Sequence, residues 1–142
     1  MIDEVCKKLM QKNITVSVAE SFTGGNVASA FVKRSGISQV FQASVIAYSN
    51  EAKIKLLGVK KDTIDTFDAV SKECATEMAQ GARRLMNSDI SISTTGFAGP
   101  SGGNDCILLR QYLRARIRIS FRQRSCQGDF GRLQGYGAHY EA

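Results

Sequence analysis

Short apolar runs recur along this chain at a spacing that is typical of strands. Three of them are rich in β-branched residues and are 6 to 9 residues long, and each one is bounded by polar or glycine-containing segments. They are I-T-V-S-V-A (14–19), V-F-Q-A-S-V-I-A-Y (40–48) and D-I-S-I-S-T-T (89–95). We therefore predict three strands.

Between these runs the apolar residues recur every three or four positions, which predicts helices. The predicted helices cover residues 2–12, about 24–34, and the segment from Asn50 to a C-terminal glycine at 58. A longer helix follows Ser71, which we predict to be its N-cap. Its apolar face consists of Ala75, Met78, Ala79, Ala82, Leu85 and Met86.

Strands that alternate with helices predict an α/β fold, in which ligands bind at the loops that leave the strand ends. Three such loops carry hydroxyl groups, glycines or both, at residues 20–25, 48–53 and 95–103. The length of 142 residues allows one domain with a real core.

The charge of the chain divides it into two parts. Residues 1–104 hold nine lysines, three arginines and ten acidic residues, whereas residues 105–142 hold seven arginines, three acidic residues and no lysine. The net charge of +6 therefore belongs mostly to the C-terminal segment. We treat 1–104 as the domain core and 105–142 as a divergent, arginine-rich tail.

Composition excludes several classes of protein. No apolar run approaches the roughly 20 residues that span a bilayer, and the N-terminus lacks a signal-peptide pattern, so we expect a cytoplasmic protein. The four cysteines lie far apart, with His139 as the single histidine, so we expect neither a metal site nor a disulfide framework. They are Cys6, Cys74, Cys106 and Cys126.

The stretch V-A-E-S-F-T-G-G (18–25) ends the first predicted strand with a serine and opens the next helix with glycines. At such a corner we expect the hydroxyl of Ser21 to be exposed and the first N–H groups of the helix to be free for an oxyanion or a phosphate. Gly24 and Gly25 would let a ligand approach the backbone closely. The alternative is that Ser21 and Thr23 are N-caps and the glycines only form the turn.

Lys53 falls in the first turn of the helix that begins near Asn50, where the helix dipole disfavours an ammonium and lowers its pKa. Partial burial would lower that pKa further, toward a value at which a lysine accepts a proton. Because residues 1–104 contain no histidine, lysine is the one plausible base for a serine nucleophile there. The phenol of Tyr48 could orient Lys53 or Ser21; alternatively, Lys53 is a solvated lysine and Tyr48 an ordinary strand-end aromatic.

The third loop, T-T-G-F-A-G-P-S-G-G (94–103), contains neither a Walker motif nor G-x-G-x-x-G. By itself it is as consistent with a structural glycine loop as with a phosphate cradle.

Together these segments resemble a known family. V-A-E-S-F-T-G-G, A-Y-S-N-E-A-K followed by L-L-G-V, A-V-S, G-A-R-R and T-G-F-A-G-P-S-G-G occur in the order and spacing of the CinA C-terminal domain family of competence/damage-inducible proteins. The resemblance covers about residues 1–104. It implies a three-layer α/β/α sandwich with a mixed sheet, and the activity of bacterial nicotinamide-nucleotide amidases, which convert nicotinamide mononucleotide to nicotinate mononucleotide and ammonia.

The resemblance also implies roles for individual residues. By motif, Ser21 is the nucleophile, Lys53 the base and Tyr48 the helper, and neither a metal nor a cofactor is needed. The implied substrate contacts are Thr23, Gly24, Gly25, Asn50, Thr95, Gly96, Ala98 and Gly99. Phe22 stands where the family often has a cysteine, and we expect no effect on the hydroxyl.

The tail departs from the family. Family members continue with further strands, a closing helix and a G-D-R-x-x-x-R segment whose arginine helps to hold the phosphate, whereas here Phe130 follows Asp129. We therefore expect the tail to leave the last strands and the helix incomplete, and our hypothesis is a reading-frame change near residues 104–106. The resemblance supports ancestry more strongly than activity.

Two alternatives to an amidase stay open. The glycine loops would also serve a non-catalytic nucleotide-binding or competence-associated module. The seven arginines of the tail would also suit a nucleic-acid arm, but their alternation with Ile and Phe resembles a strand or an accidental translation more than such an arm. We expect a nucleotide substrate, no membrane or nucleic-acid partner, and a homo-oligomer, because an incomplete sheet exposes an edge.

Overall fold

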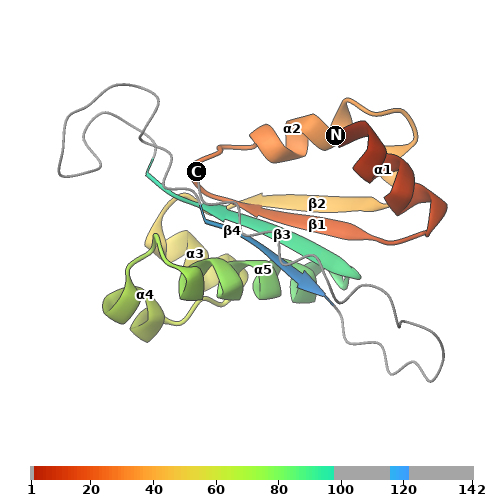
Figure 1. The fold of residues 1–142 in the computed structure, drawn as a ribbon. Helices are drawn as coiled ribbons and strands as arrows, with labels where there is room; N and C mark the ends of the chain where they lie inside the picture. The colour runs from red at the N-terminus through yellow and green to blue at the C-terminus, as the bar shows by residue number, and fades with distance from the viewer. Residues whose placement is uncertain (1, 98–115, 122–142) are drawn as a thin grey trace, which may run out of the picture.

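A computed structural model of the chain describes residues 2–97 and the backbone of residues 116–121. Its centre is a sheet in the order β2-β1-β3-β4 (Figure 1). The strands are β1 (Val16–Glu20), β2 (Phe41–Ile46), β3 (Ile90–Thr95) and β4 (Arg116–Phe121). β1 is parallel to both β2 and β3, whereas β4 is antiparallel to β3, so the sheet is mixed.

Helices cover both faces of this sheet (Figure 1). On one face lie α1 (Ile2–Gln11), α2 (Asn26–Val32) and the short 3-10 helix η1 (Ile37–Gln39), and on the other lie α3 (Asn50–Leu57), α4 (Lys61–Phe67) and α5 (Lys72–Met86). The fold is therefore a three-layer α/β/α sandwich with a mixed sheet, which confirms the predicted fold class.

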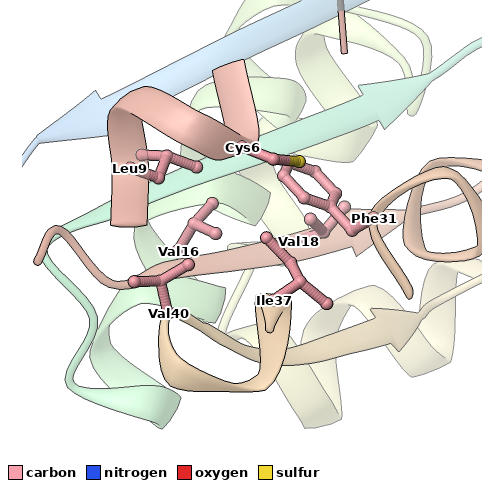
Figure 2. Close-up of a cluster of buried hydrophobic side chains, with 7 residues drawn as sticks. All are labelled: Cys6, Leu9, Val16, Val18, Phe31, Ile37 and Val40. Atoms are coloured by element: carbon pink, nitrogen blue, oxygen red, sulfur yellow. The ribbon is translucent and has the colours of Figure 1, made fainter. Parts of the chain in front are cut away.

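Successive residues of the central strand face opposite layers, because side chains alternate across a sheet. Val16 and Val18 pack with Cys6, Leu9 and Phe31 under α1 and α2 (Figure 2). Ala19, by contrast, belongs to a second buried cluster, together with residues of α3 and α5. Even-numbered residues of β1 thus face the α1–α2 layer and odd-numbered residues face the α3–α5 layer.

β3 follows the same alternation but uses hydroxyl groups on the α5 side. The Ser91 hydroxyl donates to the carbonyl of Ala79 over 2.5 Å, and the Ser93 hydroxyl donates to the carbonyl of Ala75 over 2.6 Å. These buried bonds satisfy the polar groups and fix α5 against the sheet.

The predicted helix ends agree with the structure where a capping residue marks them. Ser49 and Ser71 accept hydrogen bonds from the third residues of α3 and α5, and Gly58 ends α3 in the left-handed conformation. α2 begins later than predicted, at Asn26, because Gly24 and Gly25 adopt φ values of 57° and 102°. A left-handed backbone at these two positions forms the turn rather than the first helical residues.

Two details of the predicted elements are wrong. α4 was not predicted, since its seven residues are too few to show a helical repeat of apolar positions. Leu85 is 58% exposed and so lies outside the buried face of α5. Part of the tail forms a strand, as the alternation of arginine with Ile and Phe suggested: residues 116–121 are β4 and lie against both β3 and α5. Alternation of charged and apolar residues suits an edge strand with two different faces. The rest of the tail, including the segment of the hypothetical frame change, lies outside the described residues.

Candidate functional site

The loops that carry the predicted site all begin at one edge of the sheet. Because β1, β2 and β3 are parallel, their carboxyl ends lie together. Glu20 is paired with Ile46, and the amide of Ala47, the residue after β2, donates to the Glu20 carbonyl over 2.8 Å. Neighbouring strands are about 4.8 Å apart, so the backbones of Ser21 and Tyr48 leave the sheet beside each other.

Ser21 directly follows β1 and is buried, with 5% of its surface exposed. We predicted an exposed hydroxyl, so this prediction is wrong: neighbouring loops and helices enclose the strand end. Continued one residue beyond β1, the alternation of the strand places position 21 on the α3–α5 side, opposite to Glu20. The Gly24 amide donates to the Ser21 carbonyl over 3.1 Å and closes the turn.

The N–H groups at the start of α2 are not free. Those of Gly25, Val27 and Ala28 donate to the carboxylate of Glu20. The expectation that they would bind an oxyanion or a phosphate is therefore wrong, since the protein supplies its own anion at this position. Thr23 is also engaged there, because its hydroxyl donates to Glu20 over 2.8 Å rather than pointing to a ligand.

Lys53 is almost completely buried, with 2% of its surface exposed, inside the first turns of α3. Its Nζ donates to the carbonyl oxygen of Tyr48 over 3.0 Å. Burial lowers the pKa of Lys53, and the neighbouring Cys74 opposes that shift to a smaller extent. The same burial raises the pKa of Cys74 to about 11, so its thiol is neutral at pH 7. Among the described residues no carboxylate lies within ion-pair distance of Lys53 Nζ.

Tyr48 contributes its backbone, and the residue is 64% exposed. The interaction with Lys53 uses the carbonyl oxygen, so in this structure the phenol does not orient the lysine. The hydroxyl of Ser49 accepts from the Ala52 amide and caps α3, and Asn50 is exposed at the first position of that helix. Tyr48 and Asn50 are therefore exposed residues beside the carboxyl end of β2.

The third loop is described only in part. The Thr95 hydroxyl is buried and donates to the Ala69 carbonyl over 2.8 Å, so it fixes the loop before α5 and leaves only its backbone for a substrate. Gly96 is half-buried beside it. The predicted contacts Ala98 and Gly99 lie outside the described residues.

Three polar residues at this edge were not predicted as part of the site: Glu20, Ser44 and Thr94. All three are joined by hydrogen bonds around the 20–25 loop. The sequence did offer one signal, because Glu20 is a carboxylate that ends an apolar strand. A charged side chain that is buried must find partners.

Among the described residues, no three histidine, cysteine or acidic side chains gather as they would around a metal ion. Cys6 and Cys74 are buried free thiols. No described helix is long and apolar enough to cross a bilayer.

The comparisons with known proteins agree on one family. The family model of the CinA C-terminal domain matches residues 1–106. The chain is 56% identical over 105 residues to a CinA-like protein of Fervidobacterium nodosum, an alignment that covers 74% of this chain and 26% of that relative. This chain therefore spans about a quarter of the length of the curated relatives that it matches.

Solved structures support the same conclusion. The competence/damage inducible protein CihA of Agrobacterium tumefaciens has a TM-score of 0.70 and is 37% identical, over 72% of this chain and 62% of that one. The competence damage-inducible protein A of Klebsiella pneumoniae has a TM-score of 0.71 and is 29% identical, over 86% and 80% of the two chains.

Proposed function

This chain belongs to the CinA C-terminal domain family, and we propose that it is built as a metal-independent amidohydrolase on the carboxamide of nicotinamide mononucleotide. The products would be nicotinate mononucleotide and ammonia. The observation that carries the proposal is the buried amine of Lys53 beside the strand end that adjoins Ser21.

The proposed reaction has two halves. The neutral Lys53 amine takes the proton from Ser21 Oγ, and the oxygen attacks the amide carbon to form a C–O bond. The C–N bond then breaks, the lysine returns the proton to the leaving nitrogen, and ammonia departs. In the second half, a water molecule gives a proton to Lys53 while the water oxygen attacks the acyl carbon. The C–O bond to Ser21 then breaks, Lys53 returns the proton to Ser21 Oγ, and the acid is released.

The environment of Lys53 supports its role as the base. Burial lowers the pKa of this amine and so increases the fraction that is neutral near pH 7. The bond to the Tyr48 carbonyl needs only one N–H, so a neutral amine keeps that bond and still has its lone pair for the serine proton. A solvated lysine would instead remain charged.

Release of ammonia from nicotinamide mononucleotide tests the proposal. We expect Ser21→Ala and Lys53→Met each to abolish activity, because they remove the nucleophile and the base. Lys55→Met is the matched control, since Lys55 is an exposed lysine in the same helix that pairs with Glu51 on the surface. The amidase mechanism is refuted if Ser21→Ala retains the parent rate.

A second candidate function follows from the names of the solved neighbours, which describe competence/damage-inducible proteins rather than amidases. A non-catalytic nucleotide-binding module would bind nicotinamide mononucleotide without releasing ammonia. Calorimetric binding combined with no turnover in the parent chain would favour that module.

A further inference from the structure

Glu20 is a carboxylate with no exposed surface at the end of the central strand. Five groups donate to it. Oε2 accepts from the Thr23 hydroxyl at 2.8 Å and from the Gly25 and Val27 amides at 3.0 Å each, and Oε1 accepts from the Ala28 amide at 2.9 Å and the Ser44 hydroxyl at 3.0 Å. Fully satisfied buried carboxylates are rare and hold their surroundings rigidly.

These bonds join two strands, the turn and one helix around the serine corner. Glu20 lies on β1, Ser44 on β2, and the three amides belong to the turn and to α2. The link extends to β3, because the Thr23 hydroxyl lies 2.7 Å from the Thr94 hydroxyl. Thr23 uses its only proton on Glu20, so Thr94 is the donor of that second bond.

Glu20 is not itself a plausible base for the neighbouring serine. Burial alone would raise the pKa of this carboxyl, but the hydrogen bonds from Ala28, Thr23, Val27 and Ser44 together lower it below its ordinary value. Five donors also occupy its lone pairs. In addition, the alternation along the strand sends Glu20 and the next residue to opposite layers of the sheet.

We propose that Glu20 is a positioning residue: its hydrogen bonds with Thr23 and Ser44, extended by the bond from Thr94 to Thr23, fix the corner that aims Ser21 at the Lys53 side of the sheet. The inference rests on the proposed amidase function and assigns to that site a residue that does not touch the substrate. A displacement of about 1 Å at a reacting group costs about 10²-fold in rate. We therefore expect loss of this carboxylate to lower kcat far more than it changes KM.

Glu20→Gln is the direct test. The amide side chain is isosteric, but its NH₂ group cannot accept from the donors that face one carboxylate oxygen. We expect kcat for ammonia release to fall about 10²-fold, KM to change less than about twofold, and the midpoint of the rate–pH profile to stay where Lys53 sets it. Glu4→Gln is the control, because Glu4 is exposed on α1 and forms an ion pair with Lys8 on the surface.

A second pair keeps the inference testable if Glu20→Gln does not fold. Thr94→Val keeps the shape of the side chain and removes the hydroxyl that donates to Thr23, whereas Thr94→Ser keeps the hydroxyl. We expect about a tenfold loss of kcat in Thr94→Val and recovery to within about twofold of the parent in Thr94→Ser.

The outcomes separate this inference from the proposed function. If the parent is active, Ser21→Ala is inactive and yet both Glu20→Gln and Thr94→Val keep the parent kcat, the positioning role is wrong while the amidase stands. If Glu20→Gln shifts or removes the acidic limb of the pH profile, Glu20 acts as a base and the inference also fails. If the parent itself releases no ammonia, the proposed function fails and this inference fails with it.

Discussion

Gly81 lies in the middle of α5, and the absence of a side chain there lets α3 approach closely. A Cβ atom at this position would lie 1.9 Å from the carbonyl oxygen of Leu57 and 2.7 Å from its carbonyl carbon, whereas ordinary contact begins near 3.4 Å. Gly81→Ala therefore forces the backbone of Leu57, at the end of α3, away from α5. Because α3 also carries Lys53, the same movement would displace the proposed base.

Two effects of opposite sign decide the magnitude of this change. Alanine is a better helix former than glycine, by about 1 kcal/mol in a helix interior. Inserting an atom into a packed site costs about 1–3 kcal/mol, and the upper end applies here because the atom in the way is backbone. We expect a net loss of about 2 kcal/mol, which corresponds to a fall in Tm of about 4–8 °C for a domain of this size.

Urea unfolding followed by circular dichroism measures this difference. Gln80→Ala is the control, because Gln80 is an exposed neighbour in α5 and its substitution should leave stability unchanged within about 0.5 kcal/mol. If Gly81→Ala is as stable as the parent or more stable, helix propensity dominates and the close contact between α3 and α5 is refuted.

Two further predictions concern Lys53 and Ser71. Lys53→Met should raise the free energy of unfolding at pH 7 while it abolishes activity, because burial holds the pKa of the Lys53 amine below its ordinary value. Between the folded and unfolded pKa values of Lys53 the unfolded parent binds more protons than the folded parent, so the parent gains stability as the pH rises toward 10.5. The extra stability of Lys53→Met should therefore shrink over this range, as urea titrations at several pH values would reveal. Ser71→Ala should cost about 1–2 kcal/mol, because the Ser71 hydroxyl caps α5 by accepting from the Cys74 amide and also donates to the Asp68 carbonyl. Ser71→Thr should recover most of that loss in the same urea assay, and equal stability of Ser71→Ala and the parent would contradict the capping role.

Local signals in the sequence predicted most of the element boundaries. Ser71 was identified as the cap of α5 because a short hydroxyl side chain satisfies the first free amides of a helix. α2 was placed too early, since glycines belong to a turn as readily as to a helix start.

The site residues divide in a similar way. The placement of Lys53 in the first turns of α3 followed from the helix start, and burial then lowered its pKa as expected. The hydrogen bonds that the Thr23 and Thr95 hydroxyl groups donate within the protein could not be predicted. The acceptor of Thr95 belongs to another segment of the chain, and that of Thr23 depends on how the turn folds. The predicted contacts Gly24 and Gly25 form the turn itself, and whether they also touch a substrate stays a prediction.

The sequence by itself determined most of the elements, the Ser71 cap, the family motifs and the presence of a serine and a lysine 32 residues apart. Those features depend on interactions between residues close in the chain, and local spacing records such interactions. Only the tertiary structure decided that β2 lies beside β1, that the Glu20 carboxylate accepts from amides at the start of α2, and that Lys53 is buried. These depend on which strands pair and which layer each side chain faces, and both are settled by the packing of the whole sheet.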